Sequence, residues 1–303
     1  MLAVGIVSVQ FGAGLAGRSF GQVTPAGMTG LRLWFAALVL AGFGGRASVR
    51  AVRRLFAEHA WRDGAVVLAF GLTLGIMNYS FYQAFARIPL GIAVTIEFLG
   101  PLSVAVASSR RLIDLLWVGL AGGGVALLGR AGTSVARVDA GAVAGSATAS
   151  GRSAVVIAGV VFALIAAASW ATYILLSRST GRRFDGSSGL VIAMVIASVV
   201  VTPTAVISSG SVLLRPSVLA IGLAVGLLSS VIPYRLELET LRRIPARIFG
   251  IWMSMEPAVA ALVGLALLSQ ALSVTQWLAI GCVIVACAGA SLGSGQAASA
   301  PQV

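Results

Sequence analysis

Long apolar runs, separated by short segments that carry Arg, Pro or polar clusters, dominate this sequence. A helix that spans the hydrocarbon core of a bilayer needs about 20 mostly apolar residues. Such runs predict ten spans: 2–20, 28–44, 64–86, 91–108, 114–130, 154–177, 188–208, 217–240, 247–268 and 274–293. The pattern therefore predicts an all-α polytopic membrane protein.

The segments between and after the spans differ in character. In 47–60, the apolar residues from Val49 to Phe56 recur at helical spacing and arginines occupy the other face. This pattern is typical of an interfacial helix on an anionic inner leaflet, with a regulatory or partner-binding helix as the alternative. Segment 131–153 is rich in Ala, Gly, Ser and Thr, which predicts a flexible linker. Residues 294–303 are expected to form a disordered tail.

The composition excludes most soluble functions. Hydrophobic residues make up 58% of the 303 residues and charged residues only 10%. In a soluble protein, about a quarter of all residues are charged. The net charge of +12 comes from arginines without any lysine, but a chain this apolar is not a nucleic-acid binder. Cys282 and Cys287 share one apolar run, and His59 is the sole histidine. We therefore expect no disulfide framework, metal site, cofactor or enzyme activity.

The arginines predict the orientation, because cytoplasmic loops are enriched in positive charge. If the N-terminus is cytoplasmic, the inner loops hold Arg46, Arg50, Arg53, Arg54, Arg62, Arg110, Arg111, Arg178, Arg182, Arg183, Arg235, Arg242, Arg243 and Arg247. The outer loops hold only Arg18, Arg87, Arg130, Arg137, Arg152 and Arg215. Both termini are therefore predicted to be cytoplasmic.

Two stretches of the chain match without gaps. Arg-Ile-Pro at 87–89 is followed twelve residues after its proline by Pro101, and Arg-Ile-Pro at 243–245 is followed at the same distance by Pro257. The offset is 156 residues in both cases, about half of the chain. The chain therefore looks like two duplicated halves.

The number of spans in each half determines how the halves insert. Five spans in residues 1–130 and five in 154–293 are an odd number each, so the second half must enter the membrane upside down. Inverted repeats of this kind recur in secondary transporters, whose substrate site lies at the repeat interface near mid-bilayer. The residue pattern thus points to transport.

Two acidic residues lie deep within predicted spans. Glu97 occurs in IAVTIEFLGPL and Glu256 in IWMSMEPAVAAL. An ionised carboxylate near the bilayer centre costs about 2.5–3.5 kcal/mol, so both are functional candidates. With the 156-residue offset, Glu97 aligns with Met253 of the second half and Glu256 aligns with Gly100 of the first half. The two acids therefore lie one helical turn apart on equivalent helices. The structural alternative is that each binds a neighbouring helix, for example Glu97 to Arg32.

Other polar, aromatic and proline residues inside spans extend this set. Candidates for the substrate and proton pathway are Asn78, Tyr82, Trp170, Tyr173, Glu237 and Glu239. Aromatic residues could instead form a membrane-interface belt, but Trp170 and Tyr173 lie near the middle of their span, which favours a pocket lining. Prolines remove a backbone hydrogen bond and bend a helix, so Pro101, Pro233 and Pro257 are candidate hinges or inert packing kinks.

The segments around these acids resemble a known family. NYSFYQAFARIPLGIAVTIEFLGPL (78–102) and SSVIPYRLELETLRRIPARIFGIWMSMEPAVAAL (229–262) resemble the EamA-domain branch of the drug/metabolite transporter superfamily, and within it the threonine/homoserine exporters most. The resemblance implies two five-helix EamA repeats in a bacterial cytoplasmic membrane. It also implies efflux of small amino acids in exchange for protons. Glu97 falls in the EF-x-GPL element of that family and Glu256 in its MSMEPA element.

The leading hypothesis is a secondary-active exporter of threonine, homoserine or a similar zwitterion, working by proton antiport and alternating access. Glu97 or Glu256 would exchange protons, while the other acid, or Glu237, would meet the substrate ammonium. The alternative is a carrier of the same fold for another metabolite or a drug. An enzyme would need a clustered nucleophile and base or a metal set, which the sequence lacks. We expect a monomer or homodimer in the lipid bilayer.

Overall fold

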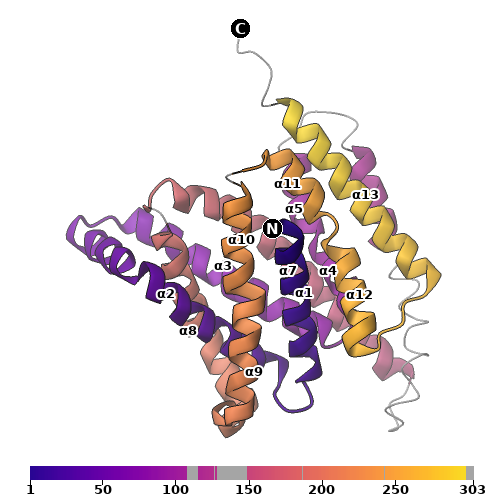
Figure 1. Ribbon diagram of the computed structural model, residues 1–303, viewed down its shortest axis with the longest axis horizontal. Coiled ribbons are helices and arrows are strands. Elements are labelled where there is room, and N and C mark those ends of the chain that lie inside the picture. The colour runs from indigo at the N-terminus through magenta and orange to yellow at the C-terminus, as the bar shows by residue number, and fades with distance from the viewer. Residues whose placement is uncertain (108–114, 126, 128–148, 186, 242, 298–303) are drawn as a thin grey trace.

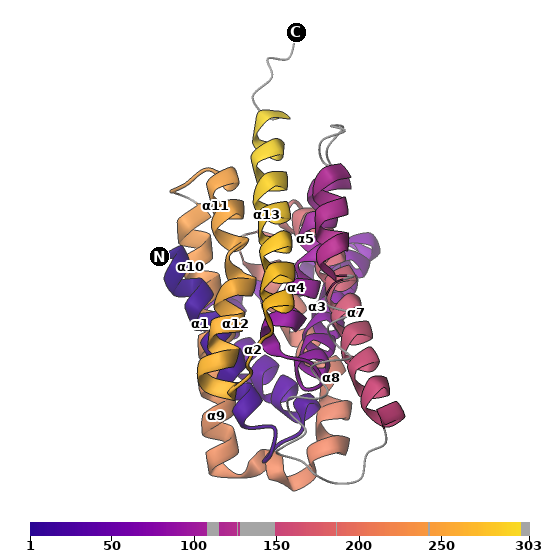
Figure 2. The same cartoon turned by 90° about the vertical axis from the view of Figure 1, so that its right-hand side faces the viewer.

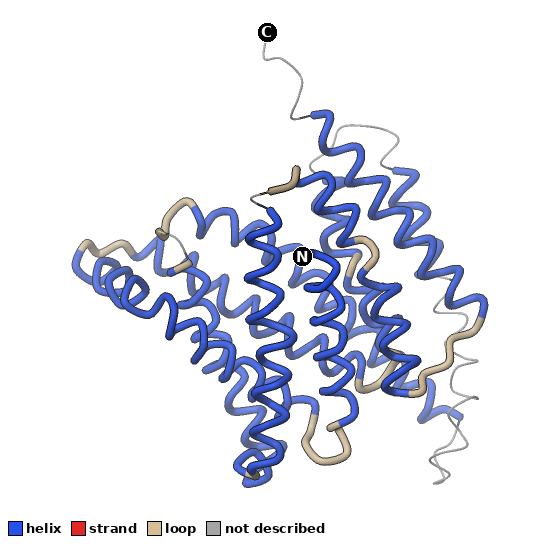
Figure 3. Tube along the Cα trace, in the orientation of Figure 1, coloured by secondary structure: helices blue, strands red, loops and turns tan. Residues whose placement is uncertain are grey.

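The described part of the chain folds into a bundle of helices. The computed structural model describes residues 1–107, 115–125, 127, 149–185, 187–241 and 243–297. Within these ranges the chain forms helices joined by short loops, without any β-strand (Figure 3). α1 begins and α13 ends toward the same end of the bundle, whereas α9 lies at the opposite end (Figure 2).

The first helices in the chain are α1 (Leu2–Arg18), α2 (Pro25–Ala57), α3 (Trp61–Phe85), α4 (Leu90–Glu97) and α5 (Leu99–Ala107). A short helix, Leu115–Val125, follows. The later helices are α7 (Ala149–Gly181), α8 (Ser188–Ser209), α9 (Pro216–Gly226), α10 (Ile232–Leu241), α11 (Ala246–Met253), α12 (Glu256–Leu268) and α13 (Val274–Ala297). A 3-10 segment, Gly210–Leu214, follows α8, and a π-helical segment, Leu227–Val231, joins α9 to α10.

Seven helical segments of the described chain are long and apolar enough to cross a membrane by length and composition. They are Pro25–Ala57, Trp61–Phe85, Leu90–Ala107, Ser153–Gly181, Ser188–Leu214, Ile248–Leu268 and Val274–Leu292. Three further apolar helices are shorter: Leu2–Arg18, Leu115–Val125 and Pro216–Val231. Each of the ten predicted spans overlaps one of these segments, and the count of ten crossings stays a prediction.

α2 is longer than the sequence pattern suggests. Instead of a span over 28–44 and a separate interfacial helix in 47–60, one helix runs from Pro25 to Ala57. Its N-terminus is fixed by the Thr24 side chain, which accepts a hydrogen bond from the Gly27 N–H. Contact with α8 continues past the predicted boundary, where the Ser48 hydroxyl donates to the Ser188 carbonyl. This contact stabilises the helical conformation of the segment beyond residue 44.

Two predicted flexible segments are partly helical. α7 begins at Ala149, inside the predicted linker 131–153, and α13 continues to Ala297, inside the predicted tail 294–303. Extending an existing helix adds one hydrogen bond for each residue fixed, so a helix can continue beyond the apolar run that predicts it. The linker residues up to 148 and the tail residues from 298 lie outside the described residues.

Helices from the two predicted halves interleave. α2 packs against α8, α3 packs against α7 and α8, α1 packs against α10 and α12, and α4 packs against α12 (Figure 1). One cluster of buried apolar residues draws members from both groups, among them Met28, Ile96, Ala166 and Ala260. The interface between the predicted halves therefore passes through the interior of the bundle.

Two helices are interrupted at corresponding positions. α4 (Leu90–Glu97) gives way to α5 at Phe98, and α11 (Ala246–Met253) gives way to α12 at Ser254–Met255. Both bounds of α11 lie 156 residues after those of α4, which is the offset of the sequence repeat. Pro101 and Pro257 explain the breaks, because neither has an N–H to donate to the carbonyl four residues earlier, at Glu97 and Met253.

α4 and α12 approach closely at Gly91. A Cβ on Gly91 would lie 2.7 Å from both Cα and Cβ of Ala261, so the backbone of α12 would have to move. We expect Gly91→Ala to lower the free energy of unfolding by about 1–3 kcal/mol, measured by thermal unfolding in detergent. Gly122→Ala is the matched control, because a Cβ there meets nothing within 4 Å. Equal losses in both variants would contradict the close approach.

Candidate functional site

A cavity of about 170 Å³ lies where the interrupted helices α4 and α11 meet α1, α2, α3, α7 and α10. Several predicted pathway residues line it together: Asn78, Glu97, Trp170, Tyr173, Glu237 and Glu256, with the candidate hinge Pro233. These residues come from both predicted halves of the chain. The structure thus brings together side chains that the sequence analysis could identify only individually.

Four of the nominated residues lie elsewhere. Tyr82 is fully buried beside the cavity lining. Glu239 lies near the C-terminal end of α10, where it forms an ion pair with Arg243. Pro101 and Pro257 lie at the helix breaks and do not line this cavity, although Pro101 lines a neighbouring one. Their proposed roles in transport stay predictions.

Glu97 and Glu256 occupy opposite kinds of helix end. Glu97 is the last residue of α4, and Glu256 is the first residue of α12. Their exposed fractions are only 9% and 6%. The Gln10 side chain of α1 donates from Nε2 to Oε1 of Glu256 over 3.0 Å. The two acids therefore face one cavity from different helices, and one of them is already bound to α1.

Arg32 is the functional candidate that sequence reasoning left without a role. Its Nη2 donates to the Ser229 carbonyl over 3.0 Å and its Nε to the Ser230 hydroxyl over 3.2 Å. Its Cζ lies 5.5 Å from the centre of the Tyr82 ring, a cation–π contact. Pro233 leaves the Ser229 carbonyl without the N–H that an α-helix would supply. The missing N–H of Pro233 thus leaves an acceptor that binds Arg32.

Arg32 does not form the ion pair with Glu97 that the structural alternative supposed. Both side chains line the cavity, but no ion pair joins them. Its hydrogen-bond partners are on the π-helical segment instead. The cavity therefore holds a positive group and three carboxyl groups that are separately placed.

A second cavity, of about 280 Å³, adjoins the first. Phe98, Trp170, Glu237 and Met253 line both cavities. The rest of its wall is mostly apolar and comes from α5, α7, α11 and α13. The two cavities thus share part of their walls, and the second lies toward the end of the bundle where α5 and α13 terminate.

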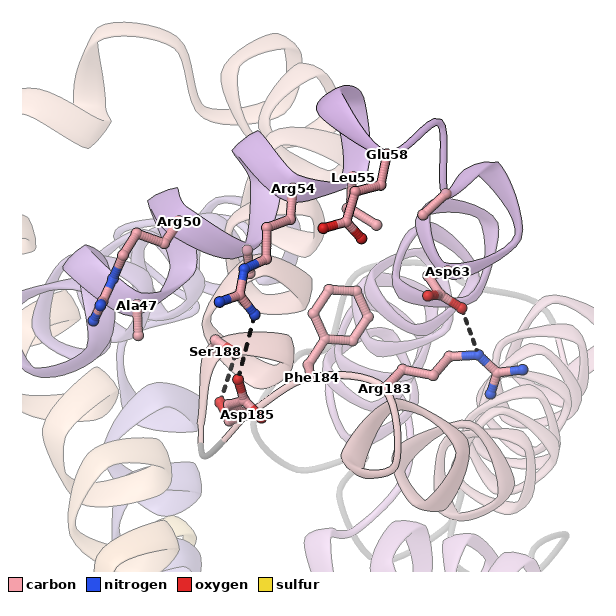
Figure 4. Close-up of a pocket in the computed structure, with 12 residues that line it drawn as sticks. Ala47, Arg50, Arg54, Leu55, Glu58, Asp63, Arg183, Phe184, Asp185 and Ser188 are labelled. Atoms are coloured by element: carbon pink, nitrogen blue, oxygen red, sulfur yellow. Dashed lines mark hydrogen bonds and ion pairs between the residues drawn. The ribbon is translucent and has the colours of Figure 1, made fainter.

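A third pocket, of about 250 Å³, lies at the surface between the end of α2, the start of α3 and the loop after α7 (Figure 4). Arg54 and Asp185 lie 3.8 Å apart across it, and Arg183 contacts Asp63 at 2.8 Å (Figure 4). Acidic and basic side chains both line this pocket and are solvent-accessible. It holds two separate surface ion pairs, whereas the charged groups of the central cavity are buried or half-buried between apolar helices.

The surface ion pairs contribute little to stability. Exposed ion pairs are typically worth about 0–1 kcal/mol, because water and salt screen them. We expect Asp63→Asn, which removes the partner of Arg183, to change the free energy of unfolding by less than about 1 kcal/mol. Thermal unfolding at low and high salt measures this, with Asp185→Asn as the comparison variant. A large loss from Asp63→Asn alone would show that the contact with the loop after α7 is structural.

Apolar helices interrupted at prolines, with charged side chains gathered around an internal cavity, define a multi-pass membrane transporter. The model of the EamA-like transporter family matches residues 157–292. The threonine/homoserine exporter RhtA of Escherichia coli (strain K12) is 39% identical over 292 residues, 96% of this chain and 90% of that protein. The same exporter of Salmonella typhimurium (strain LT2) is 38% identical over the same length. The chain belongs to the EamA-like transporter family.

The fold is also found among solved structures. A crystal structure aligns with this chain at a TM-score of 0.61, covering 98% of both chains at 18% sequence identity. At that identity the match concerns the fold alone. It shows that the helix arrangement described above occurs in another protein over essentially its whole length.

Proposed function

We propose that this chain exports threonine, homoserine or a similar small zwitterion across the bacterial inner membrane in exchange for protons. The observation that carries the proposal is the central cavity, where Arg32 and the carboxyl groups of Glu97, Glu237 and Glu256 are enclosed by apolar helices. A site with both signs of charge matches a zwitterion. The curated relatives named as threonine/homoserine exporters supply the substrate class.

We propose ten spans arranged as two inverted repeats, residues 1–130 and 154–293. Support comes from the sequence offset and from α4 and α11, which share that offset at both ends. In this arrangement the freed carbonyls of Glu97 and Met253 belong to equivalent helices of the two halves. Discontinuous helices at a repeat interface near mid-bilayer are the usual substrate site of such transporters.

The proposed orientation places both termini in the cytoplasm, as the arginine distribution predicts. The second cavity then lies on the cytoplasmic side, because Ala105 of α5 and Ser291 of α13 are close to the ends of their helices there. On the other side the Leu90 N–H donates to Oε1 of Gln270 over 2.9 Å, and Phe20 packs on Phe85 with ring centres 5.1 Å apart. These contacts support an inward-facing state closed to the outside.

Rocking of one half against the other would then alternate access to the central cavity. Either Glu97 or Glu256 exchanges protons with the aqueous side to which the cavity is open. The remaining acid, or Glu237 at the junction of the two cavities, meets the substrate ammonium. Inward movement of protons would thereby drive substrate outward.

Purified protein in proteoliposomes tests the proposal. Radiolabelled threonine or homoserine should move against its gradient when a pH gradient is imposed, and dissipating the gradient with a protonophore should stop it. In cells that lack their own exporters, expression should raise efflux and resistance to excess threonine. Absence of movement for every small amino acid tried would refute amino-acid export.

A second candidate function is export of a more apolar metabolite or drug by the same fold. The mostly apolar wall of the second cavity, with Leu102, Ile174 and Phe249, favours it. A ligand screen by thermal shift separates the two functions. Stabilisation by apolar amines but not by threonine or homoserine would favour the second one.

A further inference from the structure

Two buried acceptor atoms at the central cavity lack donors. Gln10 and Glu256 are 2% and 6% exposed, and their side chains are joined by one hydrogen bond. Within the described residues, Oε1 of Gln10 and Oε2 of Glu256 have no hydrogen-bond partner. Buried acceptors are costly to leave unpaired. An ammonium group supplies N–H donors and positive charge, which is what these two oxygens require.

Arg32 is the complementary group in the same cavity. Its Nε and Nη2 are held by Ser230 and Ser229, whereas its Nη1 has no partner in the part of the chain that the structure describes. The Tyr82 ring packs against the guanidinium. These contacts hold the side chain in place before any ligand arrives, and a preorganised guanidinium is well suited to bind a carboxylate.

We propose that Arg32 binds the carboxylate of the substrate while Glu256, positioned by Gln10, binds its ammonium group. This inference rests on the proposed function and specifies how the zwitterion is recognised. The three acids and Arg32 are the charged residues that line the cavity. With Glu256 engaged by substrate and Arg32 held away from a direct ion pair, Glu97 stays free to exchange protons.

The proposal makes the two charged groups of the substrate separately testable. Threonine carries both charges, threoninamide lacks the carboxylate, and 2,3-dihydroxybutanoate lacks the ammonium. Binding of these three ligands is measured by calorimetry on purified wild-type protein, on Arg32→Gln and on Glu256→Gln. The two variants are matched, because each replaces one charged side chain by the same neutral amide.

The expected result is a crossed pattern. Arg32→Gln should weaken threonine binding by about 10–100-fold and leave threoninamide binding unchanged. Glu256→Gln should weaken threonine and threoninamide by a similar factor and leave the hydroxy acid unchanged. If Arg32→Gln weakens threonine and threoninamide equally, Arg32 only supports the structure and the inference is overturned.

Folding and the proposed function are checked within the same experiment. If Arg32→Gln is not recovered as a monodisperse protein, Arg32→Lys is compared instead. It should weaken threonine more than threoninamide, and equal weakening overturns the inference. Failure of the proposed function appears in the wild type itself, as no response to threonine or homoserine, and it removes the basis of the inference. Failure of the inference alone appears only in the variants.

Discussion

Glu97→Gln is expected to abolish export driven by a pH gradient while leaving substrate exchange in place. An amide at residue 97 keeps the size of the carboxyl group but cannot carry a proton between the two sides. Proteoliposomes measure both activities: substrate transport driven by a pH gradient should fall by at least about tenfold, which corresponds to about 1.4 kcal/mol. Counterflow of labelled against unlabelled threonine should persist, because Arg32 and Glu256 remain.

The matched control for this experiment is Glu239→Gln. Glu239 forms an ion pair with Arg243 at the end of α10 and does not line the cavity, so both activities should stay near wild type. Retention of counterflow by Glu256→Gln but not by Glu97→Gln would reverse the roles of the two acids. Wild-type transport by both acid variants would refute a mechanism centred on them.

Replacing both prolines at the helix breaks is expected to stabilise the protein and impair transport. In Pro101→Ala/Pro257→Ala, new N–H groups can donate to the carbonyls of Glu97 and Met253. A proline inside a helix costs about 3 kcal/mol relative to alanine, so joining the broken helices raises the free energy of unfolding. Straight helices would no longer bend at the cavity, and the transport rate should fall by at least about tenfold.

Thermal unfolding and proteoliposome transport on the same preparations measure both effects. Pro216→Ala is the control, because Arg215 before Pro216 is extended (φ −65°, ψ 131°) and no helix can be joined there, whereas Met255 at the break before Pro257 is close to helical (φ −78°, ψ −9°). Unchanged transport in the double variant would show that the two prolines are inert packing kinks. Lower stability together with unchanged transport would also refute the hinge.

The apolar pattern was a good guide to where helices form and a poor guide to where they end. Each predicted span overlaps an apolar helix, because burial of a long apolar run dominates its local structure. The predicted end of the second span, at residue 44, was wrong, because nothing in the sequence indicates that Ser48 contacts α8 or that the helix continues to Ala57. Long-range contacts of this kind cannot be derived from periodicity.

The residues of the candidate site that the sequence predicted are the charged side chains within apolar runs. Glu97, Glu256 and Glu237 were found in this way and line one cavity. Gln10 was passed over, because a glutamine carries no charge, and Arg32 was considered only as a structural partner of Glu97. Their importance depends on Ser229, Ser230 and Glu256, which are brought close only by the folded chain.

The uninterrupted course of α2 connects the interior of the protein to its surface. Arg32 and Arg54 lie on the same helix, one beside the central cavity and the other at the surface pocket. With a rise of 1.5 Å per residue they are separated by about 33 Å along a single rigid rod. A tilt of about 5° therefore moves the outer end by about 3 Å relative to the inner one. α2 thereby joins its arginine-rich end to Arg32, the side chain that we propose binds the substrate carboxylate.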